Sequence, residues 1–302
     1  KPENVWVVTN KKYAALVHEQ LPEIPEGNIL QEPCRRNTAP CVAYISWRIK
    51  EKDARANIVV TPSDHIVTNC NEFRRVITSA LKFTGETDSI VTLGMKPTRP
   101  ETGYGYIQGD LSTPSARNRE IFRVDQFKEK PDLATAEKYV KDHNFFWNAG
   151  IFIMSAATIV NAFRVYQPGI AKIFESMRSI YGTEKEQEQI DLRYPECENI
   201  SIDYAIMEKA EEIFVFPADF GWSDLGTWGS LLAQSKKDAN GNATIGNNIQ
   251  MIDSKNNIVH TLNEKKVVIQ GLEGYIIAEE NGTLLICKMS EEQNIKFFSG
   301  TN

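Results

Sequence analysis

The sequence has few cysteines, and they show no pairing pattern. The five are scattered along the chain and none forms a Cys-x-x-Cys pair: Cys34, Cys41, Cys70, Cys197 and Cys287. An odd, dispersed set predicts neither a disulfide framework nor a zinc site. This cysteine usage fits a reducing compartment, so we expect a cytoplasmic protein.

Long apolar runs and an excess of positive charge are also missing. No apolar stretch approaches the length that crosses a bilayer, so no membrane partner is expected. The formal net charge of -6 argues against nucleic acid as a partner, because a phosphate-tracking surface needs a concentrated basic excess. An anionic ligand would therefore have to bind at a local site.

The 302 residues do contain ample apolar material, with 41% hydrophobic residues, enough for a large core and a second domain. Short β-branched runs alternate with helical periodicity through residues 1–235, which predicts an α/β domain with a mixed, mainly parallel sheet covered by helices. Strands are expected at 5–9, 58–61, 89–93 and 213–216. Helices are expected at 39–52, 72–83, 134–141, 156–166 and 202–210. Residues 103–130 predict paired strands around a polar loop at 112–119.

The pattern changes after Lys237. A turn cluster begins at Asp238, and short strands follow at roughly ten-residue spacing, which is typical of an all-β unit. We therefore expect one domain over residues 1–237 and a small β domain over 238–302. A closing helix is predicted at 290–298, with Ser290 as N-cap and Gln293 completing a capping box.

Two aspartates follow predicted strands. Asp64 lies in the run Thr-Pro-Ser-Asp-His, and Asp224 lies in Gly-Trp-Ser-Asp-Leu-Gly-Thr-Trp. Ligands collect beyond the carboxyl ends of strands in open α/β sheets, and Mg²⁺ takes one or two protein carboxylates together with phosphate and water. Taken singly, each aspartate could equally cap a turn or a helix. Their convergence is what favours a shared metal site.

Three further motifs place polar or flexible residues next to predicted strands. Gly103 and Gly105 flank Tyr104 and permit close approach of the backbone to a ligand, although a glycine-bearing hairpin would look the same. Glu129 could accept sugar hydroxyls while Lys130 acts as a point charge on phosphate, and a plain surface charge run is the alternative. Asn148, in Trp-Asn-Ala-Gly, offers an amide or is an ordinary turn asparagine.

A fourth motif, Gln-Glu-Pro-Cys-Arg-Arg-Asn-Thr-Ala-Pro at residues 31–40, combines carboxylate, guanidinium and amide groups. It stands at an expected helix start, with Asn37 or Thr38 as the cap. Glu32 lies near the start of the motif. Anions suit the N-terminus of a helix, so this segment is a candidate for ligand binding.

In this order, the motifs resemble the mannose-1-phosphate guanylyltransferase family within the sugar nucleotidyltransferases. The resemblance runs over nearly the whole chain, through residues 32–40, 62–65, 100–107, 127–132, 147–150, 201–204 and 221–228. It implies a Rossmann-like nucleotidyltransferase domain followed by a small domain of left-handed β-helix character. The implied reaction joins GTP and mannose-1-phosphate into GDP-mannose and pyrophosphate with Mg²⁺.

The resemblance also implies roles for individual residues. Those at the reaction centre are two metal-binding aspartates and one contact to the sugar phosphate, namely Asp64, Asp224 and Lys130. For substrate binding, the resemblance implies that Glu129 and Asn148 contact the sugar and that Tyr104 and Gly105 let the backbone approach the sugar nucleotide. Glu32 and Asn37 lie in the segment associated with the guanosine end, and Asp203 is a further substrate-binding aspartate. A homo-oligomer is among the assemblies left open.

The sequence departs from the family at its start. Members begin with a strand, a glycine-rich loop and a Pro-Lys element that wrap the triphosphate, and the sequence from Lys1 onward does not contain them. We therefore expect further N-terminal residues in the natural polypeptide and little activity from the 302-residue form alone. The 302 residues likewise do not include a counterpart of the C-terminal isomerase domain found in some relatives. Transfer to another sugar or nucleotide, and nucleotide-sugar binding without turnover, remain alternatives.

Overall fold

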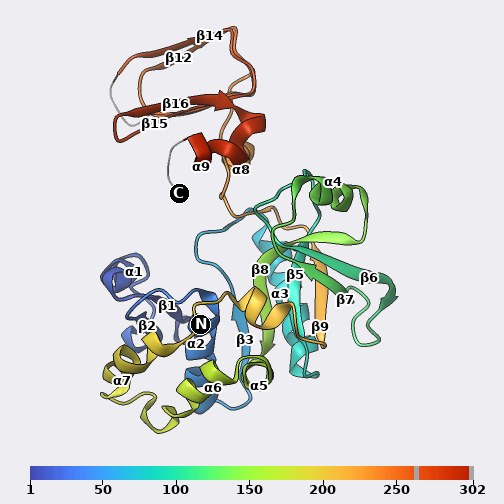
Figure 1. The fold of residues 1–302 in the computed structure, drawn as a ribbon, viewed down its shortest axis with the longest axis vertical. Coiled ribbons are helices and arrows are strands. Elements are labelled where there is room, and N and C mark those ends of the chain that lie inside the picture. The colour runs from blue at the N-terminus through green and yellow to red at the C-terminus, as the bar shows by residue number, and fades with distance from the viewer. Residues whose placement is uncertain (262–264, 299–302) are drawn as a thin grey trace. The chain divides into compact units, whose positions relative to one another are not determined.

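The computed structural model describes residues 1–261 and 265–298, which form two compact units (Figure 1). The first unit comprises Lys1–Pro62 and Cys70–Asp219, and the second comprises Ser63–Asn69 and the chain from Phe220. The boundary predicted at Lys237 therefore lies inside the second unit. Helix α8 (Trp228–Gln234) explains the difference, because its apolar side chains pack on the buried residues of the β strands that follow it.

A six-stranded sheet forms the centre of the first unit, in the order β3 (Asn57–Val60), β8 (Phe145–Ser155), β5 (Ile90–Met95), β9 (Ile213–Ala218), β7 (Phe122–Lys128) and β6 (Tyr106–Pro114). Strands β5 and β9 pair in parallel, whereas β8 pairs antiparallel with β3, β5 and β6. The prediction of a mixed sheet is confirmed. The prediction that it is mainly parallel is wrong, because most of its pairings are antiparallel. An apolar run such as β8 indicates a strand buried on both faces, but it does not specify direction.

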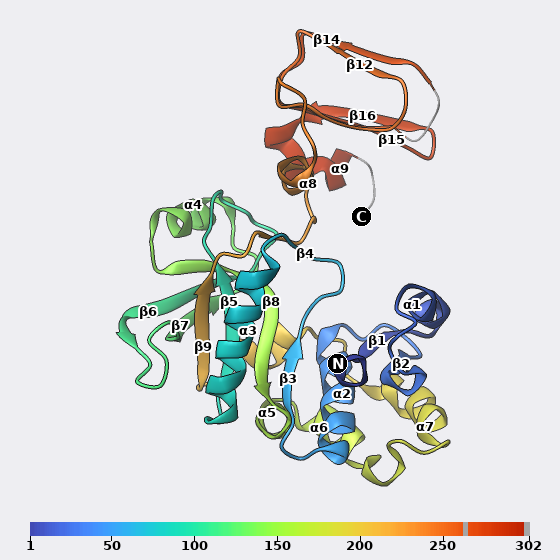
Figure 2. The same ribbon diagram turned by 180° about the vertical axis from the view of Figure 1, so that it is seen from behind.

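Helices pack around this sheet and beside a separate parallel pair, β1 (Val7–Asn10) and β2 (Ile29–Glu32). Figure 2 shows α3 running along the sheet. The helices are α1 (Ala14–Gln20), α2 (Thr38–Lys52), α3 (Cys70–Gly85), α4 (Leu133–Lys141), α5 (Ala156–Tyr166), α6 (Pro168–Glu175) and α7 (Glu186–Arg193). The helix predicted at 202–210 is instead a π-helical turn over Asp203–Met207. Such turns occur frequently at functional sites.

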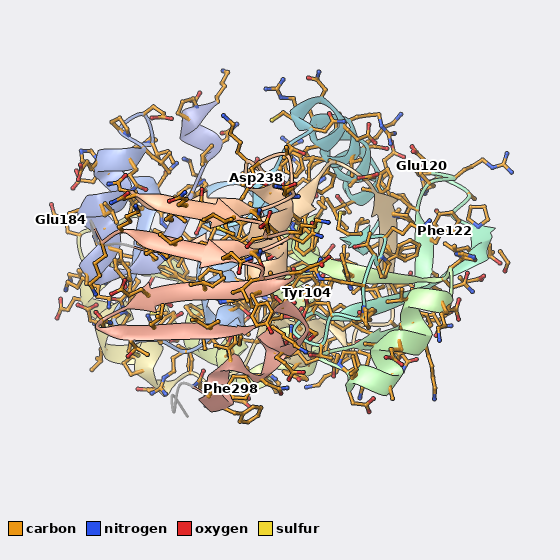
Figure 3. All side chains as sticks on the ribbon, turned by 90° about the horizontal axis from the view of Figure 1, so that it is seen from above. Tyr104, Glu120, Phe122, Glu184, Asp238 and Phe298 are labelled. Atoms are coloured by element: carbon orange, nitrogen blue, oxygen red, sulfur yellow. The ribbon has the colours of Figure 1, made fainter. Side chains whose placement is uncertain are left out.

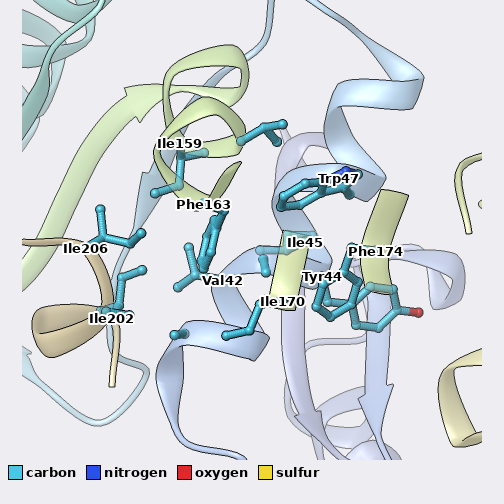
Figure 4. Packing of buried hydrophobic residues seen from close by; sticks show 14 of the residues in the cluster. Val42, Tyr44, Ile45, Trp47, Ile159, Phe163, Ile170, Phe174, Ile202 and Ile206 are labelled. Carbon is cyan, nitrogen blue, oxygen red and sulfur yellow. The ribbon is translucent and has the colours of Figure 1, made fainter. Parts of the chain in front are cut away.

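Helices α2, α5 and α6 share the main hydrophobic core (Figure 4). The Trp47 ring centroid lies 5.8 Å from that of Phe163 and 6.0 Å from that of Phe174. All three side chains are fully buried. Because large aromatic side chains contribute most to such packing, these rings hold α2, α5 and α6 together.

The predicted hairpin is confirmed, since β6 and β7 pair antiparallel. Glu120 lies in the loop between the two strands, and Phe122 is the first residue of β7 (Figure 3). The hairpin brings the residue before β6 next to the residue after β7, because Tyr106 is paired with Lys128. Gly105 and Glu129 are therefore neighbours, although the hairpin separates them in sequence.

The second unit contains a short antiparallel pair, β4 (Ile66–Val67) with β10 (Trp222–Ser223), and a stack of mainly parallel strands. The stacked strands are β11 (Ala243–Ile245), β12 (Ile249–Ile252), β13 (Ile258–His260), β14 (Val267–Gln270), β15 (Tyr275–Glu280) and β16 (Thr283–Lys288). Parallel pairing of β11, β13 and β15, and of β12 with β14, means that the chain winds as a coil. β16 then returns antiparallel along β15.

Buried asparagines stack along one corner of this coil. The Asn257 side chain donates to Asn242 Oδ1 at 2.9 Å and to the Leu272 carbonyl at 2.9 Å, and it accepts from the Tyr275 N–H at 2.8 Å. These bonds satisfy backbone groups that successive turns of the coil would otherwise bury unpaired. The short strands predicted after Lys237 thus form a regular coil.

The closing helix starts differently from the prediction. A 3-10 helix over Met289–Asn294 leads into α9 (Ile295–Phe298), with Lys288 as N-cap and no capping side-chain bond. Ser290 is therefore inside the helix and not its cap. The start is fixed instead by the backbone, because Met289 N–H donates to the Gly274 carbonyl at 2.7 Å.

Among the described residues, no helix combines the length and the apolarity that a membrane crossing requires.

Candidate functional site

The two aspartates proposed as metal ligands both belong to the second unit. Asp224 directly follows β10, and Asp64 precedes β4 by two residues. Since Ser223 is paired with Ile66, the antiparallel register brings the segments that carry the two aspartates side by side. The sequence indicated this convergence but missed β4 and β10, because strands of two residues leave no periodic pattern.

The surroundings of this aspartate pair are polar and open. The Asp64 side chain is 84% exposed, with Oδ1 3.8 Å from His65 Nε2. His65 Nδ1 accepts a hydrogen bond from Trp222 Nε1 at 3.1 Å, which joins the two segments again. Asp224 Oδ1 accepts from the Gly226 N–H at 2.9 Å. The Asp64 carboxylate is therefore accessible, and both aspartates are held on paired backbone.

This donor set fits a hard cation that shares its shell with a substrate. No group of three or more His, Cys, Asp or Glu side chains within residues 1–261 and 265–298 is arranged to hold a metal. Two carboxylates alone would leave most of an octahedral shell to phosphate and water. That is how proteins usually hold Mg²⁺, and it is unlike a closed structural site.

A second group of predicted residues lies together in the first unit. It comprises Gly105 before β6, Glu129 after β7, Asn148 on β8 and Asp203 at the start of the π-helical turn. Asn148 N–H donates to the Gly105 carbonyl at 2.8 Å, and Asn148 Nδ2 donates to Asp203 Oδ1 at 3.0 Å. A Cβ built on Gly105 would lie 2.5 Å from Glu129 Oε2. We call these four residues the acidic cluster.

The position of Asn148 depends on an irregularity in β8. Opposite β5, Thr92 is paired with Phe152 and Gly94 with Asn148, so β8 carries extra residues in this interval. Gly150, within it, has φ +67°, a conformation that glycine adopts at little cost. Bulges of this kind re-aim side chains next to sites. Here the Asn148 side chain turns back, and its Oδ1 accepts from the Gly150 N–H at 3.0 Å.

The two carboxylates of the acidic cluster resist ionisation. Burial raises the pKa of Glu129 above its ordinary value of 4.5, and the neighbouring Asp203 raises this pKa further. Burial also raises the pKa of Asp203, although the hydrogen bond from Asn148 opposes the effect. A ligand that donated hydrogen bonds to these carboxylates would compensate for the water they lose.

Lys130 supplies positive charge at the edge of the cluster. Its side chain is 63% exposed, and Nζ lies 3.7 Å from Glu129 Oε1. The Lys130 backbone has φ +47°, and its N–H donates to the Tyr104 carbonyl at 3.3 Å. The left-handed turn thus redirects the chain after β7, so that the side chains of adjacent residues Glu129 and Lys130 lie together. A regular strand would point them to opposite faces.

Tyr104 has a structural contact that the sequence did not indicate. Its ring packs edge-on against Trp147 at a centroid distance of 5.2 Å.

An ion pair lies in the loop before Gly105. Glu101, whose side chain is only 1% exposed, pairs with Arg99 at 3.2 Å and accepts from the Gly103 N–H at 3.2 Å. This buried ion pair orders the loop that leads to Gly105. The sequence alone indicated no role for either charged residue.

Glu32 and Asn37 make structural contacts in the first unit. Glu32 Oε2 accepts from the hydroxyl of buried Tyr194 at 2.7 Å. Asn37 is the N-cap of α2, and its side chain accepts from the Thr38 N–H at 2.9 Å. Of the two caps that the sequence allowed, the structure selects Asn37. Thr38 Oγ1 accepts from the Ile202 N–H at 2.8 Å, which connects the start of α2 to the segment before Asp203.

The raised pKa of Glu129 leads to a prediction about stability. A carboxyl group with a raised pKa in the folded state lowers stability as the pH increases above its unfolded-state pKa. We expect Glu129→Gln to increase the free energy of unfolding at neutral pH, and to increase it by less near pH 4. Chemical denaturation between pH 4 and 8 measures this difference, with exposed Glu137→Gln on α4 as the control. If the increase in the free energy of unfolding caused by Glu129→Gln did not become larger as the pH rises, the raised pKa of Glu129 would be contradicted.

Comparison with known proteins places the chain in a family. Residues 1–241 match the family model for nucleotidyl transferase. A mannose-1-phosphate guanylyltransferase of Escherichia coli is 34% identical over 96% of this chain and 63% of its own length. The xanthan biosynthesis protein XanB of Xanthomonas campestris is 34% identical over 96% of this chain and 61% of its own length. The chain thus spans less than two thirds of these relatives.

A solved structure is similar as well. The crystal structure of a mannose-1-phosphate geranyltransferase from Thermus thermophilus superposes with a TM-score of 0.82, covering 99% of this chain and 84% of the other at 27% identity. The nearly complete coverage extends the likeness to both units. With the family model spanning most of its length, the chain belongs to the nucleotidyl transferase family.

Proposed function

We propose that this chain acts as a mannose-1-phosphate guanylyltransferase, which forms GDP-mannose and pyrophosphate from GTP and mannose-1-phosphate. The observation that carries the proposal is the acidic cluster with Lys130 beside it. Carboxylate and amide groups match sugar hydroxyls, and an exposed ammonium group matches a phosphate. The names of the relatives from Escherichia coli support mannose-1-phosphate as the sugar phosphate.

In this reaction a phosphate oxygen of mannose-1-phosphate attacks the α-phosphorus of GTP, and the bond to the leaving pyrophosphate breaks. No side-chain nucleophile is required, so the protein's contribution is positioning and charge neutralisation. Glu129, Asn148 and Asp203 would orient the sugar, while Lys130 would hold its phosphate. Tyr104 and Gly105 would let the backbone approach the sugar, and Glu32 and Asn37 would lie towards the guanosine end.

A divalent cation belongs to the same proposal. Asp64 and Asp224 would hold Mg²⁺, because their two carboxylates fit an ion that completes its shell with phosphate and water. When bound, the ion supplies positive charge against the phosphates. We also infer that the coil of the second unit is a left-handed β-helix, and that the five free cysteines reflect a cytoplasmic location.

The test is a substrate panel on the natural polypeptide. Pyrophosphate release is measured with each nucleoside triphosphate and each hexose-1-phosphate in the presence of Mg²⁺. The proposal expects the highest kcat/KM with GTP and mannose-1-phosphate. A clear preference for another pair would reassign the substrates. Binding of GDP-mannose in a calorimeter without pyrophosphate release would show a binding protein in place of an enzyme.

Gly105 provides a local test of the sugar-phosphate site. Its Cβ in Gly105→Ala would approach Glu129 Oε2 to 2.5 Å, so the carboxylate would have to move. We expect KM for mannose-1-phosphate to rise by about ten- to a hundredfold, because small misplacements at a site have large effects. Gly169→Ala on α6 is the matched control, since no atom lies within 4 Å of its Cβ. Unchanged KM in Gly105→Ala would remove Glu129 from the sugar site.

A further inference from the structure

A buried hydroxyl lies behind the acidic cluster, on the central strand β5. Thr92 is fully buried, and its Oγ1 donates to Asn148 Oδ1 at 3.1 Å. The same amide oxygen accepts from the Gly150 N–H at 3.0 Å. Asn148 Oδ1 is thus held by two donors, one from β5 and one from the bulge in β8.

The other end of the amide is fixed by charge. Asn148 Nδ2 donates to Asp203 Oδ1 at 3.0 Å. If the amide were turned over, its NH₂ group would face the Gly150 N–H and its oxygen would face the Asp203 carboxylate. Both ends would then lose hydrogen bonds inside the protein, where unsatisfied polar groups are costly. The orientation seen in the structure is therefore the one in which each of these groups is paired.

We infer that Thr92 is a positioning residue of the sugar-phosphate site, acting through the amide of Asn148. The inference rests on the proposed function, because it assumes that Asn148 and Asp203 receive the sugar. Thr92 itself is buried beneath Asn148 and would not touch the substrate. Its hydroxyl, together with the Gly150 N–H, holds the amide of Asn148 in place with the NH₂ group towards Asp203, so that the two side chains present a fixed pattern of donor and acceptor to the sugar hydroxyls.

The test replaces this hydroxyl by a methyl group. Thr92→Val keeps the shape of the side chain and removes the donor to Asn148 Oδ1, leaving only Gly150 N–H. We expect KM for mannose-1-phosphate to rise about three- to tenfold, the effect of one hydrogen bond, while KM for GTP stays unchanged. Thr92→Ser retains a hydroxyl and should restore the KM of the parent protein.

Thr84 offers a matched control in the same unit. It is also buried, and its Oγ1 lies 3.2 Å from the side-chain oxygen of an asparagine, Asn57, and 3.1 Å from the Ala80 carbonyl. That pair joins α3 to β3 and has no part in the acidic cluster. Thr84→Val should therefore lower thermal stability about as much as Thr92→Val without changing KM for mannose-1-phosphate. A purely structural role for Thr92 would make the two variants alike in KM.

The outcomes separate this inference from the proposed function. If the parent protein does not use mannose-1-phosphate, the proposed function fails first. If the parent does use it and Thr92→Val has the KM of the parent, the positioning role is overturned. Should Thr92→Val fail to fold, comparison of Thr92→Ala with Thr92→Ser gives the same contrast, since the two differ only by the hydroxyl. Equal KM values in that pair would also overturn the inference.

Discussion

Asp64→Asn and Asp224→Asn are each expected to lower Mg²⁺-dependent turnover by about a hundredfold or more, the scale of losing one electrostatic stabiliser of a transition state. Asparagine keeps the size of the side chain but removes the negative charge that a hard cation prefers. For Asp224 the amide oxygen can still accept from Gly226 N–H as Oδ1 does at 2.9 Å, so the turn should persist. Pyrophosphate release by the natural polypeptide over a range of Mg²⁺ concentrations measures the effect.

Two comparisons sharpen this experiment. Exposed Asp253→Asn lies in the same unit and should have the activity of the parent protein. The variants at Asp64 and Asp224 should also require more Mg²⁺ for half-maximal rate, because a ligand of the ion is weakened. Near-normal turnover of either variant at ordinary Mg²⁺ concentrations would remove that aspartate from the metal site.

The second large effect is expected from Lys130→Ala. Loss of the ammonium group should raise KM for mannose-1-phosphate by about ten- to a hundredfold, the value of a hydrogen bond to a charged group. KM for GTP should stay close to that of the parent. Initial rates with one substrate varied at a time separate the two constants. Lys128→Ala, two residues earlier and also exposed, is the control for loss of one positive charge near the site.

The backbone at Lys130 requires a further variant. Its φ of +47° disfavours most side chains, so Lys130→Ala could act through the turn as well as through charge. Lys130→Gly relieves the backbone and still lacks the charge, and Lys130→Arg keeps the charge. If glycine restored KM, the turn would be the cause. Equal losses of GTP and mannose-1-phosphate affinity in all variants would contradict the assignment of Lys130 to the sugar phosphate.

Local patterns predicted much of the first unit. The helix expected at 156–166 is α5 with the same bounds, and the hairpin after Gly103 pairs as expected. These features depend on residues close in sequence, such as the apolar spacing of a helix and the polar loop of a hairpin. The direction of β8 depends on which strands it meets, so its apolar residues could not reveal that it runs antiparallel between β3 and β5.

The candidate site was predictable to a similar extent. Motifs next to strands indicated Glu129, Asn148 and the two aspartates, whose roles stay predictions. The bulge at Gly150 and the hydroxyl of Thr92 were not predictable, because both act through contacts between strands distant in sequence. The two-residue strands β4 and β10 were also missed. The pairing of Ile66 with Ser223 shows how segments so far apart in the chain meet.

That pairing has a consequence for biosynthesis. Residues 63–69 belong to the second unit, yet the ribosome makes them before most of the first unit and long before Phe220. Until Trp222 and Ser223 have been synthesised and have left the ribosome, β4 cannot pair with β10, and Asp64 cannot lie beside Asp224. The proposed metal site should therefore form late during translation, after the central sheet. A nascent chain that has emerged from the ribosome to just after β9 should already contain the acidic cluster but not the aspartate pair.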